Sequence, residues 1–367
     1  MSDYFKNQII TYMGNKRKFI PYINELVNFV EAEIGEKLTI AEGFSGSGIV
    51  ARLFKTRAET LYVNDISGYS ETLNKCYLDT PNQTQKIMIN KYVDAANNFA
   101  ENPPSNIDKW VCKHWAPKNP NPEINDRVYF THENGKRIDA YRTFIKQCPE
   151  RLRHYLLAPL LTEVSKHNNT NGQFSAFYKG EDGVGKYGGK KEIDVTRITK
   201  KITIPYPLFS EESCEVFVSK SDVRDWIREI PEVDLVYYDP PYNKHPYSIY
   251  YFLLDIINDW DLTIDIPDTY RGQPKTWYKS PYNSFKKAKE EFEFLIKNTK
   301  SKFIMVSYNN GGIIPLDVLN TILSKYGKVT KFPIDHKTYN RMKGIASKKR
   351  KKEDIKVKEF IWLVDCR

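Results

Sequence analysis

Apolar residues gather in short runs within the first 80 residues and again after residue 214. Runs of about four to eight such residues are typical of strands buried in a parallel sheet. Between the runs, apolar positions such as Ile20, Ile23 and Val27 recur at helical spacing, which predicts helices. The sequence therefore predicts an α/β fold with strands at 38–41, 60–64, 215–219, 235–238, 302–307, 329–334 and 357–364.

The pattern changes between residues 81 and 206, where short helical stretches appear among many Asn, Lys, Trp and Tyr residues. Glycines and lysines crowd into 180–191, which predicts a mobile basic loop. We interpret 81–206 as a domain inserted between two parts of an α/β core, 1–80 and 207–367. Its cations and aromatic rings suit contact with phosphates and stacking on bases. A solvated insertion without such a role is the alternative.

One predicted strand ends abruptly at Asp239-Pro240-Pro241-Tyr242. The prolines cannot donate backbone hydrogen bonds and their φ angles are fixed, so the strand stops there in a stiff loop. A carboxylate, rigid carbonyls and an aromatic ring are thereby placed at the carboxyl end of a strand, where open α/β sheets bind ligands. Taken alone, the motif is equally compatible with a plain Asp-Pro turn.

Further polar turns follow other predicted strands. The glycine-rich turn 42–48 lies between a strand and a helix, an arrangement in which backbone approaches a nucleotide-like ligand. Asp65 follows at the next strand end, at a spacing that suits the hydroxyls of a ribose. Asp222 follows another strand and is placed to accept from an adenine amino group. Each of these two acids has helix capping as its alternative.

The N-terminal loop 11–18 precedes a predicted helix. Its amides and Lys16 are suited to receive a carboxylate or a phosphate at the helix entrance. A basic helix start without a ligand is the alternative.

The chain carries 56 Lys and Arg against 46 Asp and Glu, a net charge of +10. This balance favours a polyanionic partner, nucleic acid before an anionic membrane. No apolar run approaches the roughly 18 residues of a membrane span. Five scattered cysteines without C-x-x-C spacing indicate a reduced intracellular protein. They also argue against a structural zinc site, so we expect no metal.

In this order, the motifs resemble those of the Dam-like (alpha-group) adenine-N6 DNA methyltransferases, which use S-adenosylmethionine. The stretch 12–16 is similar to the family's Trp-Ala-Gly-Gly-Lys cofactor loop, with Asn15 in place of a glycine. The turn 42–48 resembles E-P-F-x-G-x-G, with Gly43 in place of proline, and 64–67 resembles the acidic D-I-N strand end. The Asp-Pro-Pro-Tyr motif matches completely.

The resemblance covers roughly residues 9–80 and 214–367. It implies a Rossmann-like methyltransferase fold, with a seven-stranded, mostly parallel sheet and an inserted, mainly helical target-recognition domain at 81–206. The implied activity is methylation of adenine N6 in double-stranded DNA by base flipping, as the modification enzyme of a type II restriction–modification system or as an orphan methylase. The resemblance also implies a cognate restriction endonuclease encoded nearby as a partner and no membrane. The expected location is cytoplasmic, prokaryotic or phage, with association to the nucleoid through DNA. Sequence specificity is expected to lie in the insert, with help from 270–283.

The implied catalytic residues are Asp239, Pro240, Pro241 and Tyr242. The implied cofactor-binding residues are Tyr12, Met13, Gly14, Lys16, Glu42, Phe44, Ser45, Gly46, Gly48, Asp65, Ile66, Asp222 and Asp239. The residues expected to contact DNA are Lys244, Tyr247, Arg271, Lys275, Lys348, Lys349 and Arg350.

Three other activities stay open at this point. RNA or protein amide methyltransferases more often carry Asn at the position of Asp239, and cytosine-N4 DNA methyltransferases usually carry Ser there. A non-catalytic DNA-binding relative would have no need of the glycine turn or of Asp239.

Overall fold

The computed structural model describes residues 2–275, 278–334 and 358–367. At its centre is a seven-stranded sheet with the strand order β3-β2-β1-β4-β5-β7-β6. Strand β7 runs antiparallel to β5 and β6, whereas the other neighbours are parallel. The predicted mostly parallel α/β fold is therefore confirmed. The strands are β1 (Leu38–Glu42), β2 (Ala58–Asp65), β3 (Glu215–Lys220), β4 (Val233–Tyr238), β5 (Ser301–Asn309), β6 (Lys328–Ile334) and β7 (Glu359–Asp365).

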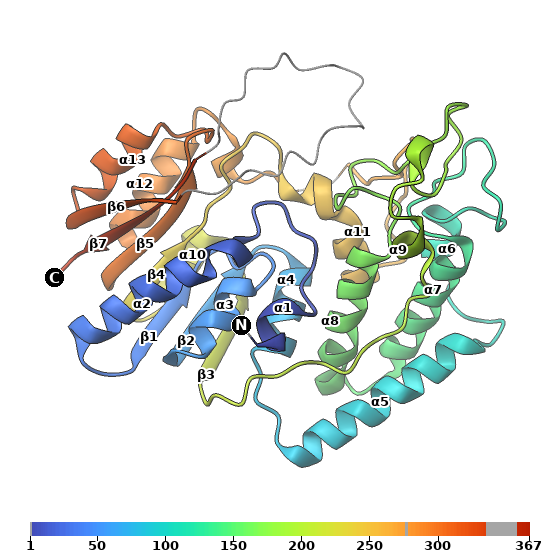
Figure 1. Cartoon of the computed structure of the whole chain (residues 1–367), viewed down its shortest axis with the longest axis horizontal. Helices are drawn as coiled ribbons and strands as arrows, with labels where there is room; N and C mark the ends of the chain where they lie inside the picture. Colours follow the sequence, from blue (N-terminus) through green and yellow to red (C-terminus); the bar gives the residue numbers. More distant parts are fainter. Residues whose placement is uncertain (1, 276–277, 335–357) are drawn as a thin grey trace.

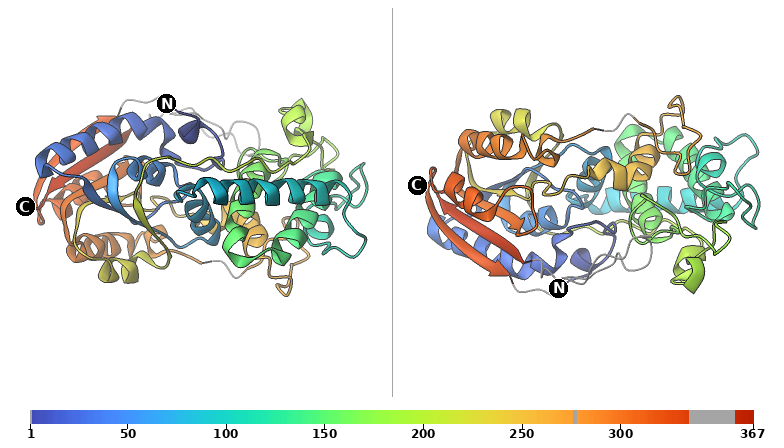
Figure 2. Two further views of the ribbon diagram at one scale, coloured as in Figure 1. Left: turned by 90° about the horizontal axis from the view of Figure 1, so that it is seen from below. Right: turned by 90° about the horizontal axis from the view of Figure 1, so that it is seen from above.

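Helices cover both faces of this sheet, which Figure 2 shows edge-on. In β4, Leu235 and Tyr237 pack with the layer that contains α2 and α3, while Val236 and Tyr238 pack with α10, α12 and α13. This alternation follows from the pleat of a strand, whose successive side chains point to opposite faces. The covering helices are α1 (Asp3–Lys6), α2 (Ile20–Ile34), α3 (Ile49–Lys55), α10 (Val223–Glu229), α12 (Ala288–Asn298) and α13 (Leu316–Leu323).

A helical lobe lies beside the sheet and holds most of residues 81–206 (Figure 1). The sequence predicted only short helices here, but α5, α7 and α8 have 19, 16 and 17 residues. Their buried faces include charged side chains such as Arg137, Asp139 and Glu163, so the apolar periodicity is broken. The lobe helices are α5 (Gln83–Glu101), α6 (Val111–His114), α7 (His132–Gln147), α8 (Glu150–Lys166) and α9 (Val195–Thr199).

The hydrophobic core of the lobe extends beyond the predicted insert. It also includes residues of α4 (Gly68–Tyr77) and of α11 (Tyr247–Asp259), which pack against α8. The boundaries at 80 and 206 stay a prediction, because the packing continues across both of them. Within the described residues, no helix is both long and apolar enough to cross a lipid bilayer.

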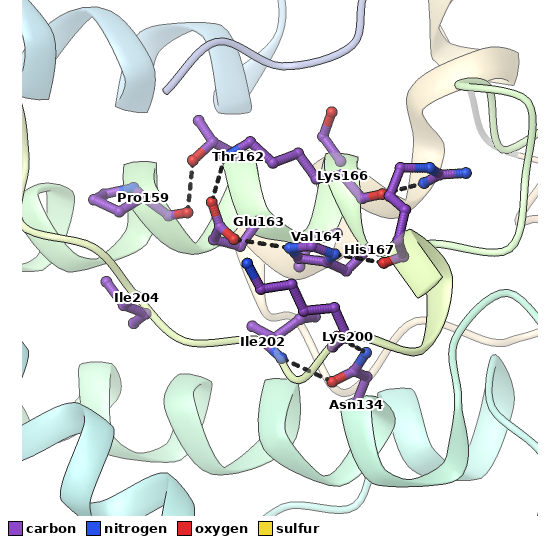
Figure 3. A network of polar contacts seen from close by, with 12 residues as sticks. Asn134, Pro159, Thr162, Glu163, Val164, Lys166, His167, Lys200, Ile202 and Ile204 are labelled. Carbon is purple, nitrogen blue, oxygen red and sulfur yellow. Dashed lines mark hydrogen bonds and ion pairs between the residues drawn. The ribbon is translucent and has the colours of Figure 1, made fainter. Parts of the chain in front are cut away.

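The segment that leaves the lobe toward β3 is fixed by buried polar contacts (Figure 3). The amide of Asn134 donates to the Lys200 carbonyl at 2.9 Å, and its oxygen accepts from the Ile202 N–H at 2.9 Å. One ring nitrogen of His167 lies 3.0 Å from the Glu163 carboxylate, and the other lies 2.6 Å from the Arg197 carbonyl. The exit path is therefore held by the lobe helices.

The glycine-rich segment 180–191 makes defined contacts with the lobe, and the mobility that its composition predicts stays a prediction. Lys179 and Gly185 form an isolated antiparallel bridge. The buried side chain of Asn169 accepts from the Gly188 N–H at 3.0 Å and donates to the Val128 carbonyl at 2.9 Å. A buried asparagine outside the segment thus anchors it at Gly188, which the local glycine content did not reveal.

Candidate active site

A cavity of about 370 Å³ lies where β1, β2, β3 and β4 end. Ligands of open parallel sheets bind at this edge. The structure brings most of the predicted site residues into its wall, whereas Gly48, Pro240 and Tyr242 belong to the adjoining turns. The predicted residues in the wall are Tyr12, Met13, Gly14, Lys16, Glu42, Phe44, Ser45, Gly46, Asp65, Ile66, Asp222, Asp239, Pro241 and Tyr247.

A buried ion pair joins the N-terminal loop to the end of β4. The Nζ of Lys16 lies 2.9 Å from Oδ1 of Asp239, and their side chains are 3% and 18% exposed. Burial raises the pKa of Asp239 to about 6, although the nearby Lys16 ammonium opposes this shift. Burial disfavours the charged ammonium, yet Asp239 and Glu359 together raise the pKa of Lys16 above its usual value. The pair is held charged at the cavity wall.

The ring of Tyr242 packs on this ion pair. The ammonium of Lys16 lies 5.5 Å from the centroid of the Tyr242 ring. The Tyr308 ring packs edge-on against the Tyr242 ring, with their centroids 5.8 Å apart. Gly14 has a φ of +76°, and a Cβ on it would lie 2.6 Å from the Tyr242 hydroxyl. The N-terminal loop can therefore approach the motif only with glycine at this position.

The glycine turn after β1 is fixed by the end of β2. Gly46 has a φ of +51°, and a Cβ there would lie 2.9 Å from the Tyr12 ring. Its N–H donates to Oδ2 of Asp65 at 2.8 Å, while the Ser67 N–H donates to Oδ1 at 2.9 Å. Asp65 therefore holds the turn directly. The helix-capping alternative fails for Asp65, because the N-cap residue of α4 is Ser67.

Glu42, the last residue of β1, is 1% exposed and lines the cavity. Its Oε2 has no hydrogen-bond partner among the described residues. Burial raises its pKa well above the usual range, and the nearby Asp239 and Asp65 raise it further. A buried oxygen without a partner is costly, so this position favours a ligand that donates a hydrogen bond or carries a positive charge.

Three tyrosine rings form one stacked group, of which Tyr12 and Tyr247 line the cavity and Tyr251 lies behind them. The Tyr12 ring lies 4.7 Å from that of Tyr251 and 5.1 Å from that of Tyr247, with interplanar angles of 20° and 16°. The Met13 N–H donates to the Tyr251 hydroxyl at 2.6 Å. Tyr247, predicted to contact DNA, thus belongs to the aromatic wall beside the N-terminal loop.

Asp222 both caps a helix and lines the cavity. One oxygen accepts from the Arg224 N–H at 2.9 Å at the start of α10, as the capping alternative predicted. The other oxygen accepts from the Tyr278 hydroxyl at 2.5 Å. Its predicted role toward an adenine amino group stays a prediction.

Three more of the residues predicted to contact DNA belong to segments beside the cavity wall. Lys244, Arg271 and Lys275 are exposed, and the last two flank the cavity-lining pair Gln273–Pro274. The remaining ones, Lys348, Lys349 and Arg350, lie outside the described residues.

The lobe contacts the segment that carries Arg271. Its Arg127 donates to the carbonyls of Pro267 at 2.9 Å and Thr269 at 3.0 Å. The Lys179 ammonium lies 3.8 Å from the Tyr270 ring centroid. Parts of the insert are therefore coupled to the rim of the cavity.

Sequence reasoning missed the acidic face of α11. Tyr251, Asp255 and Asp259 are spaced four residues apart, and Asp255 and Asp259 line the cavity. Burial, together with the nearby Asp259, raises the pKa of Asp255 to about 8. The spacing puts Asp255 and Asp259 on one helix face, a signal that the apolar run around them concealed.

Comparison with known proteins agrees with this geometry. The family described as D12 class N6 adenine-specific DNA methyltransferase matches residues 12–303. The type II methyltransferase M.NlaIII of Neisseria lactamica is 27% identical over 363 residues, which cover 97% of this chain and 99% of that protein. The type II methyltransferase M.CviAII of Paramecium bursaria Chlorella virus 1 is 25% identical over 336 residues, which cover 90% of this chain and 92% of that protein. The modification methylase LlaI of Lactococcus lactis subsp. lactis is 28% identical over 332 residues, which cover 86% of this chain but 48% of that protein.

Proposed function

The chain belongs to the D12 class N6 adenine-specific DNA methyltransferases, and from this membership we propose that it transfers the methyl group of S-adenosylmethionine to N6 of adenine in double-stranded DNA. The observation that carries the proposal is the buried Lys16–Asp239 pair, 2.9 Å apart at the cavity wall. This pair places a carboxylate on a rigid loop, next to the cavity, at the edge of the sheet where ligands bind.

The residues present fit the proposed cofactor. The volume of about 370 Å³ is that of a small-molecule site. The Oε2 of Glu42, which has no hydrogen-bond partner in the described part of the chain, suits a ligand that carries an ammonium and a sulfonium. Gly46 would let the backbone approach the ligand, Asp65 would face the ribose hydroxyls and Asp222 the adenine. When bound, the cofactor supplies a methyl group on a cationic sulfur.

The chain's own residues would prepare the adenine amino group. This nitrogen is a poor nucleophile because its lone pair is delocalised into the ring. Asp239 and the carbonyl of Pro240 would each accept one of its hydrogens, which frees the lone pair for attack on the methyl carbon. The carboxylate would also stabilise the positive charge that develops on the nitrogen. After methyl transfer the substrate nitrogen would carry one proton too many, and the Asp239 carboxylate would accept that proton.

The target adenine must leave the stack of the duplex before it can reach the cavity. The proposed platform is Tyr242, whose ring contacts Lys16 and Tyr308. Pro241, which lines the cavity, keeps the loop stiff. Lys244, Arg271 and Lys275, with the basic residues around 348–350, would contact phosphates of the same duplex.

We further propose that the chain is the modification enzyme of a type II restriction–modification system. The names of M.NlaIII and M.CviAII support this assignment. A restriction endonuclease with the same recognition sequence would be its partner, and both would act on DNA in the cytoplasm. Recognition is assigned to the lobe and to the segment 270–283, which meet where the Lys179 ammonium lies over the Tyr270 ring.

The test is incubation of the purified protein with labelled S-adenosylmethionine and unmodified genomic DNA, followed by modification-sensitive sequencing. We expect N6-methyladenine within one short recurring sequence. Label on cytosine would move the assignment to cytosine-N4 methylation. No label on DNA, with the cofactor bound in calorimetry, would refute DNA as the substrate and direct the search to RNA and protein.

A further inference from the structure

Glu359 brings a second carboxylate to Lys16. It is the first residue of β7, 9% exposed, and its Oε2 lies 3.9 Å from Nζ of Lys16. That oxygen has no hydrogen-bond partner within residues 2–275, 278–334 and 358–367. The residue lies beyond the stretch 12–303 that matches the family.

The antiparallel course of β7 explains this position. The parallel strands end at the cavity edge, and an antiparallel strand among them begins at that same edge. Glu359 pairs in register with Asn309, the last residue of β5. The topology therefore places its side chain among the ends of the parallel strands, next to the N-terminal loop.

The charges at this point show what Glu359 adds. Lys16 and Asp239 alone form a neutral pair, whereas the pair with Glu359 carries one net negative charge. The Lys16 ammonium already donates to the Gly14 carbonyl at 3.3 Å. Among the described residues, its ionic contacts are with Asp239 at 2.9 Å and Glu359 at 3.9 Å. A flexible lysine side chain shared by two carboxylates is held more tightly than one paired with a single carboxylate.

We propose that Glu359 is a positioning residue of the active site, which holds the Lys16 ammonium in place against Asp239. The proposal rests on the function proposed above. Asp239 then keeps one orientation while its exposed side faces the adenine amino group. The net negative charge of the group also favours the positive charge that develops on the substrate nitrogen. Glu359 acts through Lys16 and does not touch the substrate.

The test compares Glu359→Gln, which keeps the size of the side chain and removes its charge, with the wild-type protein. We expect the single-turnover methylation rate to fall about tenfold or more, because small displacements of catalytic groups are costly. Cofactor affinity should stay within about twofold, and the unfolding temperature should stay near that of the wild type. Glu359→Asp, which keeps the charge, should retain more activity than Glu359→Gln.

Two measurements separate positioning from a structural role. In a Lys16→Met background, Glu359→Gln should cause little further loss of rate, because residues that act through one another are not additive. Reductive methylation followed by mass spectrometry should label Lys16 several-fold faster in Glu359→Gln, because Glu359 raises the pKa of that ammonium. The matched control is Asp365→Asn on the same strand, where Asp365 pairs with Arg367. Asp365→Asn should change neither the methylation rate nor the rate at which Lys16 is labelled.

Wild-type rates and unchanged Lys16 labelling in Glu359→Gln would overturn the proposal, as would an equal loss of rate in the Lys16→Met background. The labelling measurement does not depend on methyl transfer. A wild-type chain that fails to methylate DNA would therefore refute the proposed function, while the labelling result would still show whether Glu359 acts on Lys16.

Discussion

The carboxylate of Asp65 and the backbone N–H of Gly46 are joined by a hydrogen bond of 2.8 Å. The end of β2 thereby fixes the turn after β1. The other oxygen of Asp65 accepts from the Ser67 N–H, so the carboxylate ties together two loops of the cavity wall.

Asp65→Asn should weaken cofactor binding about tenfold or more. The amide offers one acceptor where the carboxylate offers two, and hydrogen bonds to charged groups contribute about 1.5–3 kcal/mol. Calorimetric titration with S-adenosylmethionine measures the loss. Asp261→Asn is the matched control, because Asp261 accepts from the N–H two residues ahead in the same manner but is exposed. Equal affinities in both variants would contradict this role of Asp65.

Gly46→Ala should lose both stability and cofactor affinity. Its φ of +51° disfavours a side chain, and the new Cβ would lie 2.9 Å from the Tyr12 ring. Gly35→Ala is the control, because Gly35 has a φ of +82° but a Cβ added there would meet no atom within 4 Å. Both variants should lose about 1 kcal/mol or more in the free energy of unfolding. Only Gly46→Ala should also bind the cofactor weakly, and a similar loss in Gly35→Ala would count against the explanation.

Asp239→Ala should abolish methylation while cofactor binding largely survives. The acceptor for the amino group is lost, whereas the glycine turn and Asp65 remain. Filter-binding assays with labelled cofactor and DNA measure turnover, and calorimetry measures cofactor affinity. Asp225→Ala on α10, an exposed acid, is the control and should behave as the wild type. Turnover near the wild-type rate in Asp239→Ala would reject the assigned role.

The methylation rate should rise with pH through the pKa of Asp239, which burial raises to about 6. Only the carboxylate accepts from the amino group, so the rate should be half-maximal near this pH and fall about tenfold per unit well below it. The free energy of unfolding should depend on pH in the opposite direction to the rate. Because folding raises the pKa of Asp239, its stabilising contribution is fully present below the ordinary pKa of aspartate, about 4, and is lost as the pH rises through about 6. Single-turnover rates at saturating cofactor from about pH 5 to 8 test the first statement, and a flat profile would contradict it.

Arg271→Ala should weaken DNA binding at low salt and make it less dependent on salt. One lost phosphate contact lowers the slope of log K against log salt by about 0.9. Fluorescence anisotropy with a labelled duplex, measured over a range of salt concentrations, gives this slope. Lys297→Ala is the control, because Lys297 is exposed on α12, which covers the sheet. An unchanged slope in Arg271→Ala would remove this residue from the DNA interface.

The strands near the cavity were predictable from the sequence because their apolar runs end in distinct chemistry. The run Leu235–Tyr238 meets two prolines, and Leu38–Ala41 meets a glycine turn. Both endings restrict the backbone strongly. The direction of β7 was not predictable, since an apolar run carries no sign of parallel or antiparallel pairing. The position of Glu359 beside Lys16 depends on that direction and was therefore missed.

The long helices of the lobe were hidden for a different reason. Buried Arg137 donates to the carbonyls of Ile202 at 2.6 Å and Ala100 at 3.0 Å, so a charged residue occupies a core position of α7. Such a residue appears as a solvent-facing position in the sequence pattern. Its partners lie 65 and 37 residues away in the chain, and local sequence contains no information about them.

The position of β7 between β5 and β6 has a consequence for the synthesis of the protein. Within the described part of the chain, β6 hydrogen-bonds to β7 alone. On the ribosome, Lys328–Ile334 is made before Glu359–Asp365. Strand β6 therefore has no β7 to pair with until the later segment has been synthesised. The arrival of β7 also delivers Glu359 to Lys16. We therefore expect a newly made chain to close its sheet and acquire its full set of active-site charges in one late event.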